Sequence, residues 1–214
     1  MGAALHDVGM GISEADFQEM KDGIPELLEY IRKHPNELTA EYTRLFHHKL
    51  SAAFVKKYSR LFEIPSDEYV YCISKVASGH RDADLLDEYG FPSAMRLSNG
   101  STVNLAYLTA LVKLADELDV TSDRNLMFDY SKVNEEWSEH QTMCYKCHGA
   151  IKRLCLTGDS LILYYATDEP EVEKEILRTK GKVEHTFSQY AAVVENRTAF
   201  RNTIKQVTFT RIKN

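Results

Sequence analysis

Five side chains that can bind metal ions stand on the apolar side of an expected helix or directly after an apolar Ala-Ala-Leu run. They are His6, Asp7, His47, His80 and Asp116. A carboxylate in a protein core costs free energy unless a donor, a cation or a metal ion compensates its charge. Imidazole and carboxylate together suit divalent metals, and such mixed sites suit hydrolysis of phosphate esters. Taken one at a time, the histidines also fit ordinary core histidines, and Asp116 also fits an ion pair with Lys113 or Arg124.

Helices must position most of these residues. Apolar residues recur at helical spacing over residues 13–34, with a break at Gly23-Ile24-Pro25, and again over residues 39–61 and 66–80. A further helix is predicted over residues 103–119, with Leu105, Leu108, Val112 and Ala115 on one face. The polar, turn-rich segment 82–102 precedes this helix, and we expect the segment to form part of a pocket wall.

The C-terminal part of the chain has a different pattern. Residues 151–167 form two β-rich runs joined by Thr-Gly-Asp-Ser, which is a hairpin signal. A charged helical pattern follows over residues 171–196, and residues 204–212 read as a third strand. The β-β-α-β order predicts a small α+β subdomain over residues 136–214, after a helical domain over residues 1–135.

Composition sets the general class of the protein. The chain has 214 residues, 43% of them hydrophobic, and a net charge of −6, which argues against nonspecific nucleic-acid binding. No stretch approaches the roughly 18 apolar residues that a membrane-spanning helix requires. No secretory signal is recognisable, and the four unevenly spaced cysteines do not resemble a disulfide framework. We therefore expect a cytoplasmic protein that does not bind a membrane.

The order and context of the metal-binding residues resemble the HD superfamily of metal-dependent phosphohydrolases. LHDVGM resembles the His-Asp segment and LVKLADELD the late-Asp helix of that family, which puts His6, Asp7 and Asp116 in ligand positions. HHKLSAAFV and ISKVASGHR resemble the two extra histidine positions of branches that hold two metals, which adds His80 and either His47 or His48. The resemblance covers about residues 1–125 and implies an HD-type helical domain there. Together with the small α+β subdomain that the β-β-α-β pattern predicts, the expected fold is mainly α.

The resemblance implies cleavage of a nucleotide or another phosphate ester by a metal-activated water. It implies one or two divalent ions, of Mn, Fe, Mg, Zn or Ni. With two ions, Asp7 bridges them, His6 and Asp116 hold one, and His47 and His80 hold the other. With one ion, His6, Asp7 and Asp116 bind it, and His47 or His80 acts as a general acid or phosphate contact. Asp7, His47 and His80 are thus the expected catalytic residues.

Two arginines are the candidate phosphate contacts, because a guanidinium group binds phosphate oxygens in pairs. Arg44 lies one turn before the histidine pair of its helix, and Arg81 directly follows His80. Both also fit ordinary surface arginines. The ADELDVTSDR stretch resembles bacterial HD proteins linked to Hsp90-like ATPases, which would make such an ATPase a protein partner. A homodimer is left open.

One departure from the family pattern favours an alternative function. The family's first histidine lies well upstream of the His-Asp pair, and only five residues precede His6 here. Either the natural protein starts earlier, or this ligand is missing or replaced. The alternative is a non-catalytic HD-like module with an incomplete metal site that binds a nucleotide or a partner. Met10, at a position where the cyclic-dinucleotide branch has Lys, and the absence of Gly-Tyr-Pro after His80 argue against that branch.

A second metal motif is considered around Cys144, Cys147 and His148, whose spacing resembles a zinc or haem fragment. No second paired motif accompanies it. We therefore expect reduced thiols in a linker before the first C-terminal strand.

Overall fold

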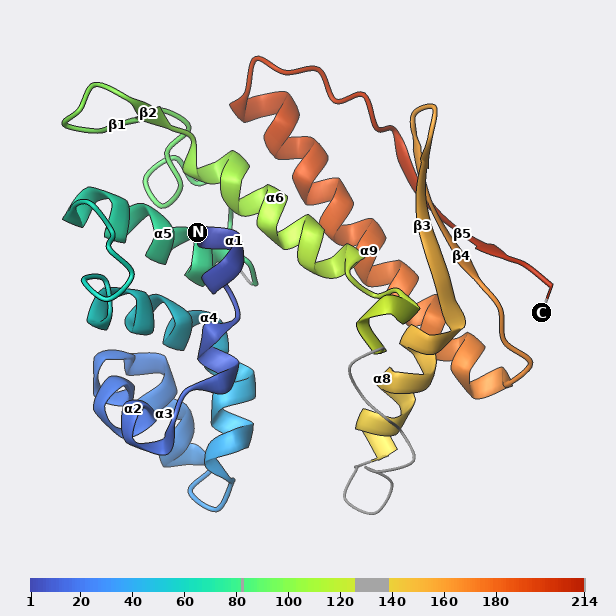
Figure 1. Cartoon of the computed structure of the whole chain (residues 1–214), viewed down its shortest axis with the longest axis horizontal. Helices are drawn as coiled ribbons and strands as arrows, with labels where there is room; N and C mark the ends of the chain where they lie inside the picture. The colour runs from blue at the N-terminus through green and yellow to red at the C-terminus, as the bar shows by residue number, and fades with distance from the viewer. Residues whose placement is uncertain (82, 126–138, 214) are drawn as a thin grey trace. The chain divides into compact units, whose positions relative to one another are not determined.

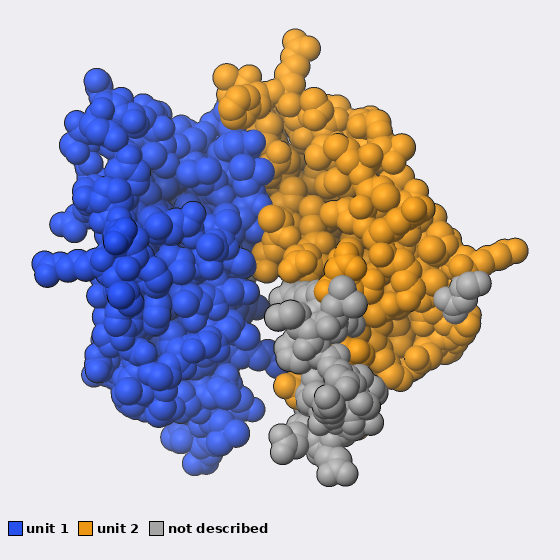
Figure 2. All heavy atoms as spheres, in the orientation of Figure 1, with its two compact units in different colours: residues 1–113, 196–198 blue, residues 114–195, 199–214 orange. Residues whose placement is uncertain are grey.

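A computed structural model describes residues 1–81, 83–125 and 139–213, apart from the side chains of residues 124, 125 and 140 (Figure 1). The chain forms two compact units, residues 1–113 with 196–198 and residues 114–195 with 199–214 (Figure 2). Helices dominate, and the strands form one small two-stranded and one three-stranded sheet. This confirms the predicted mainly α class. Among the described residues, no helix is long and apolar enough to cross a bilayer.

Unit 1 is built of short and medium helices. In chain order they are α1 (Gly2–Leu5), the 3-10 turn η1 (Val8–Gly11), α2 (Glu14–Met20), η2 (Lys21–Gly23), α3 (Pro25–Lys33), α4 (Thr39–Lys57), α5 (Asp67–Gly79) and α6 (Leu105–Leu118). A short antiparallel pair, β1 (Met95–Arg96) and β2 (Thr102–Val103), precedes α6. The predicted break after residue 23 is confirmed, because Pro25 begins α3 and its missing amide proton costs nothing there.

The buried faces of the central helices differ from those expected. In α6, Leu105, Ala106, Thr109 and Ala110 are buried, whereas Leu108 is 42% exposed. In α4, Leu50, Ser51 and Val55 are fully buried, whereas Leu45 is 42% exposed. The prediction followed one row of apolar residues along each helix, but a helix face that touches another helix closely also accepts small and hydroxyl side chains from the neighbouring rows.

Unit 2 contains the predicted β-β-α-β order. Its elements after α6 are η3 (Ser122–Asn125), α8 (Glu139–Ala150), β3 (Ile151–Thr157), β4 (Ser160–Tyr165), α9 (Pro170–Arg197) and β5 (Gln206–Arg211). Strand β4 is central, antiparallel to β3 and parallel to β5. The hairpin turn contains Gly158 at φ +59°, where a glycine avoids strain. Leu163, Ile176 and Val183 lie fully buried in the core between sheet and helix.

The linker predicted around Cys144 and Cys147 is wrong, because these residues lie in the helix α8. The helix shows little segregation of apolar and polar residues, so the sequence carried no periodic signal for it. All four cysteines are free thiols. The predicted domain boundary at residues 135/136 lies outside the described residues. Helices α6 and α9 each contribute residues to both units.

Candidate metal centre

A glycine lets the segment that carries Asp7 lie directly against α4. The backbone N–H of Gly9 donates to the Ser51 Oγ at 2.8 Å. A Cβ atom at Gly9 would lie 2.2 Å from the carbonyl oxygen of His47, so no other residue fits without a shift of the backbone. Because Asp7 is two residues away, this close approach brings its carboxylate to the histidines of α4.

A second glycine fixes the position of His80, which follows the last residue of α5 and is only 3% exposed. A Cβ atom at Gly79 would lie 2.6 Å from the ring of Phe91 and 2.7 Å from Thr109 Cγ2. The end of α5 is therefore in tight contact with its surroundings. This packing leaves the His80 ring little freedom.

The three histidines around Asp7 share one tautomer. Each ring contacts through Nδ1 the backbone carbonyl oxygen three residues earlier, at 2.7 Å for His6 and His47 and 2.6 Å for His80. A carbonyl oxygen only accepts, so Nδ1 carries the proton in all three rings. In a neutral imidazole Nε2 is then unprotonated, and this is how metal-binding histidines are commonly oriented.

The Nε2 atoms and the Asp7 carboxylate converge. Asp7 Oδ1 lies 3.2 Å from His47 Nε2 and 3.5 Å from His80 Nε2, and Oδ2 lies 3.5 Å from His6 Nε2. The Nε2 atoms of His47 and His80 are themselves 3.2 Å apart. Among the described residues, Asp7 Oδ1 is buried without a hydrogen-bond partner.

This arrangement fits a divalent cation. Lone pairs and a carboxylate oxygen that face one another repel unless a cation or a proton lies between them. The three potential ligand atoms of Asp7, His47 and His80 all lie within 4.8 Å of one another. Nitrogen and oxygen donors of this kind suit the first-row transition metals.

The electrostatic environment favours the protonation states in which Asp7 and His47 can bind a metal ion. Contact with the His80 imidazole lowers the pKa of Asp7, burial opposes this, and the charges of His6 and His47 lower it further. Burial lowers the pKa of His47, although the hydrogen bond to the Arg44 carbonyl and the negative charge of Asp7 oppose this, and electrostatic interactions with His80 and Arg81 lower it further. An ionised carboxylate next to a neutral imidazole is the state that binds a metal.

The structure separates His47 from its competitor His48. His47 points at Asp7, whereas the buried His48 ring lies 5.7 Å from the His47 ring and 6.2 Å from the His80 ring. Burial lowers the pKa of His48 to about 4, with the charges of His47 and His80 as further causes. Its buried Nδ1 has no hydrogen-bond partner among the described residues. His47, not His48, is therefore the α4 histidine at the carboxylate.

The remaining predicted residues are two exposed arginines of unit 1 and an aspartate of unit 2. Arg44 is exposed on α4, and its carbonyl oxygen accepts the His47 Nδ1 proton. Arg81 is exposed, and its carbonyl oxygen accepts a hydrogen bond from the Lys113 ammonium group. Asp116 lies on the part of α6 that belongs to unit 2 and is partly buried. The roles of all three stay predictions.

Sequence reasoning missed the residues that support the site. Gly9, Gly79 and Ser51 hold the ligand segments in contact, and none of them has metal-binding chemistry. A signal was present, since both glycines stand within two residues of a predicted ligand. Glycine near a ligand is typical of a close approach between backbones.

The sequence matches the HD-CE family over residues 1–190. The match extends beyond the predicted limit at residue 125 and takes in α8, β3, β4 and most of α9. No curated protein and no solved structure matches the chain. All five predicted ligands lie within the matched range, but the match does not bear on the predicted branch linked to Hsp90-like ATPases. The chain thus belongs to the HD-CE family and contains the HD-type domain that its motifs predict.

Proposed function

We propose that this HD-type domain is a metal-dependent phosphohydrolase that cleaves a nucleotide or another phosphate ester. The observation that carries the proposal is the convergence of the His47 and His80 Nε2 atoms on Asp7 Oδ1, which is buried and accepts no hydrogen bond from the part of the chain that the structure describes. Such a cluster is costly in an apoprotein, and metal binding removes the cost. The family match supports the HD-type domain, and the reaction rests on the chemistry of the donor set.

Asp7, His47 and His80 would hold one ion, and His6 and Asp116, with Asp7 shared, would hold another or complete the same site. A divalent ion of Mn, Fe, Mg, Zn or Ni supplies Lewis acidity for a phosphoryl oxygen and acidifies a water molecule. The protein orients the His47 and His80 rings for this role through the hydrogen bonds of their Nδ1 atoms to backbone carbonyl oxygens. Should one ion suffice, held by His6, Asp7 and Asp116, His47 or His80 would be available to donate a proton to the leaving oxygen or to contact the phosphate.

Arg81 is the better candidate for orienting the phosphate. Its positive charge is close enough to contribute to the lowered pKa of both His47 and His48. A guanidinium group binds phosphate oxygens in pairs, so Arg81 would bind an anion that reaches the carboxylate cluster. Arg44 is exposed one turn before His47 and would make a more peripheral contact.

We also propose a cytoplasmic location, which the four free cysteines support. An Hsp90-like ATPase remains the proposed protein partner, on the resemblance of the ADELDVTSDR stretch alone.

The proposal is tested by metal analysis of the wild type beside Asp7→Asn, with Asp22→Asn as the matched control. Asp22 is exposed in η2 and forms no part of the donor set. After loading with Mn²⁺ and desalting, we expect about one or two equivalents in the wild type and in the control, and none in Asp7→Asn. Hydrolysis of bis(p-nitrophenyl) phosphate should follow the metal content.

Absence of metal from the wild type, even after loading, would contradict the proposal. It would favour the alternative of a non-catalytic HD-like module. Metal that stays in Asp7→Asn would show that the ion binds elsewhere in the chain.

A further inference from the structure

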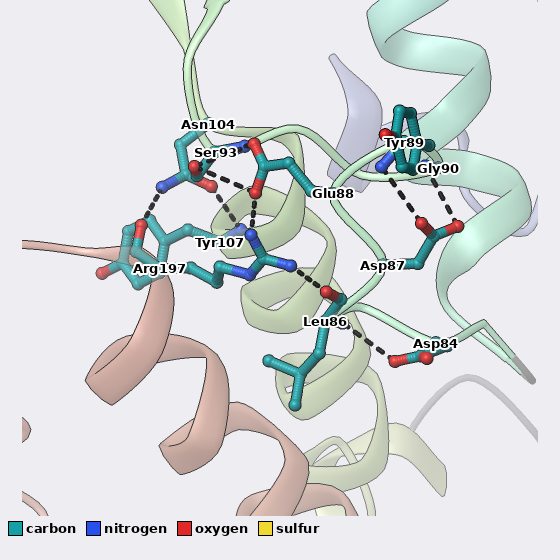
Figure 3. A network of polar contacts seen from close by, with 10 residues as sticks. All are labelled: Asp84, Leu86, Asp87, Glu88, Tyr89, Gly90, Ser93, Asn104, Tyr107 and Arg197. Carbon is teal, nitrogen blue, oxygen red and sulfur yellow. Dashed lines mark hydrogen bonds and ion pairs between the residues drawn. The ribbon is translucent and has the colours of Figure 1, made fainter.

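A network of polar contacts joins the last residue of α9 to the loop that follows His80 (Figure 3). Arg197 forms an ion pair with Glu88 through Nη1, and its Nη2 donates to the carbonyl oxygen of Leu86. The Arg197 side chain is only 16% exposed, although it carries a full charge. A guanidinium group with two partners in different directions holds a loop better than a single point charge does.

The backbone of Arg197 is fixed as well. Asn104 Nδ2 donates to the Arg197 carbonyl oxygen at 2.7 Å, and Asn104 Oδ1 accepts from the Tyr107 N–H at 2.9 Å. One amide side chain therefore bonds both to a backbone carbonyl at the end of α9 and to a backbone N–H at the start of α6, two helix ends at which the helical hydrogen-bond ladder stops. This leaves the guanidinium little freedom to move away from the loop.

Within the loop, carboxylates close two turns. Glu88 accepts from the Ser93 N–H at 2.9 Å and from its hydroxyl at 3.1 Å. Asp87 accepts from the N–H groups of Tyr89 and Gly90 at 3.0 and 3.1 Å. Figure 3 shows both carboxylates turned toward these partners. Phe91 lies within the turn that Glu88 and Ser93 close.

Phe91 connects the loop to the candidate metal centre. Its ring is buried, with 7% exposed, and its N–H donates to the Asp87 carbonyl oxygen at 2.8 Å. The ring lies directly at the Cα of Gly79, where an added Cβ would be 2.6 Å away. Gly79 immediately precedes His80, so a shift of the Phe91 ring would change the position of the His80 imidazole.

We propose that Arg197 is a positioning residue for this site. It holds Glu88 and Leu86, the loop holds Phe91 against Gly79, and the contact keeps His80 in the orientation that faces Asp7. The importance of that orientation rests on the proposed function, in which His80 is a ligand. Ligands of a metal site need support from residues that do not touch the metal, and loss of such support weakens binding by about 10- to 100-fold.

The test compares Arg197→Gln with Arg178→Gln, both on α9. Arg178 is 67% exposed, and its ion pair among the described residues is with Glu175 of its own helix, at 3.6 Å, so its loss controls for removal of a charge from α9. In metal-free protein with ¹³C-labelled histidine, we expect the His80 ring signal to shift in Arg197→Gln alone. Its assignment comes from His80→Asn. Amide exchange of residues 84–93 should quicken by about tenfold.

A second variant, Glu88→Ala, removes the other half of the ion pair and should produce the same two changes. The double variant should be no worse than the more affected single one, because the two residues act through one contact. If Arg197→Gln does not fold, Glu88→Ala decides the question. An unshifted His80 signal together with unchanged loop exchange in the folded variants would overturn the proposal.

These readouts need neither metal nor activity, so they are separate from the test of the proposed function. If the wild type binds no Mn²⁺, the phosphohydrolase fails while the positioning role can still hold. If it does bind Mn²⁺, its affinity should fall by about tenfold in Arg197→Gln and stay unchanged in Arg178→Gln.

Discussion

At the scale of residues, Gly9 lies so close to α4 that a Cβ atom there would be 2.2 Å from the His47 carbonyl and 2.8 Å from the Ser51 nitrogen. Both are backbone atoms, which cannot rotate out of the way. The segments that carry Asp7 and His47 can therefore lie in contact only because residue 9 is a glycine and has no side chain. Gly11, in the same 3-10 turn, has no neighbouring atom within 4 Å of such a Cβ.

We predict that Gly9→Ala lowers the free energy of unfolding by about 1–3 kcal/mol, because the backbone must shift to relieve the overlap. It should also weaken Mn²⁺ binding, because Asp7 moves with it. Gly11→Ala should leave both quantities nearly unchanged. Urea unfolding and metal titration of the two variants check this, and equal effects at both positions would contradict the close-approach argument.

His48 makes stability depend on pH. Its pKa is about 4 in the folded protein, below the ordinary value of 6.5. Between these values the unfolded chain binds the proton and the folded one does not, so the free energy of unfolding decreases as pH falls through this window. The contribution is fully present above pH 6.5, and each unit of pKa shift corresponds to about 1.4 kcal/mol.

We predict that His48→Gln reduces the loss of stability between pH 7 and pH 4.5. The measurement is the urea midpoint of the metal-free protein at both pH values. Some loss should remain in the variant, because burial also lowers the pKa of His47. An unchanged pH dependence in His48→Gln would show that other groups cause it.

At the scale of elements, the start of α6 and the end of α9 share the side chain of Asn104. Its Oδ1 caps the first turn of α6, the helix that also presents Thr109 to the Gly79 contact. Neither Ala nor Ser could reach both helices in this way, since only an amide offers a donor and an acceptor at this length.

Asn104→Ala should lower the free energy of unfolding by about 1 kcal/mol or more, because a helix cap is lost and the Arg197 carbonyl loses its donor. Asn36→Ala, in the exposed turn before α4, is the control and should have little effect. Thermal unfolding of both variants tests this. If Asn36→Ala were destabilised as much as Asn104→Ala, the loss of stability could not be assigned to the contacts of Asn104 with α6 and α9.

At the scale of the whole molecule, residues 196–211 take part in both units: strand β5 completes the three-stranded sheet of unit 2, and residues 196–198 belong to unit 1. Strand β5 pairs with the central strand β4 and buries Val207 in the unit 2 core. Residues 196–198 belong to unit 1, where Arg197 holds the loop after His80. Both lie beyond residue 190, where the family match ends.

We predict that a chain ending at residue 190 loses cooperative unfolding, because β4 is left as an unpaired edge and the Glu88 carboxylate loses its partner. A chain ending at residue 212 keeps β5 and should unfold like the wild type. Thermal melts followed by near-UV circular dichroism distinguish the two. A cooperative transition in the shorter chain would mean that the matched range is sufficient for folding.

The sequence by itself determined the kinds of element and their order. The helical periodicity, the break before Pro25 and the turn around Gly158 are local signals, and each produced the expected element. The residue types at His6, Asp7, His47 and His80 likewise predicted a cluster that the structure does bring together. For the elements, local sequence is sufficient because backbone preferences and hydrogen-bonding chemistry act over a few residues.

Only the tertiary structure decided which faces meet. Neighbouring residues such as His47 and His48 point in directions about 100° apart on a helix, and the rotation of α4 against Asp7 selects the first. The same applies to α6, where Thr109 is buried and Leu108 exposed. Residues far apart in sequence also meet in the close backbone contacts at Gly9 and Gly79. The same is true of the contacts between Arg197 and the loop after His80. Such contacts form only when the whole unit packs, so no local pattern predicts them.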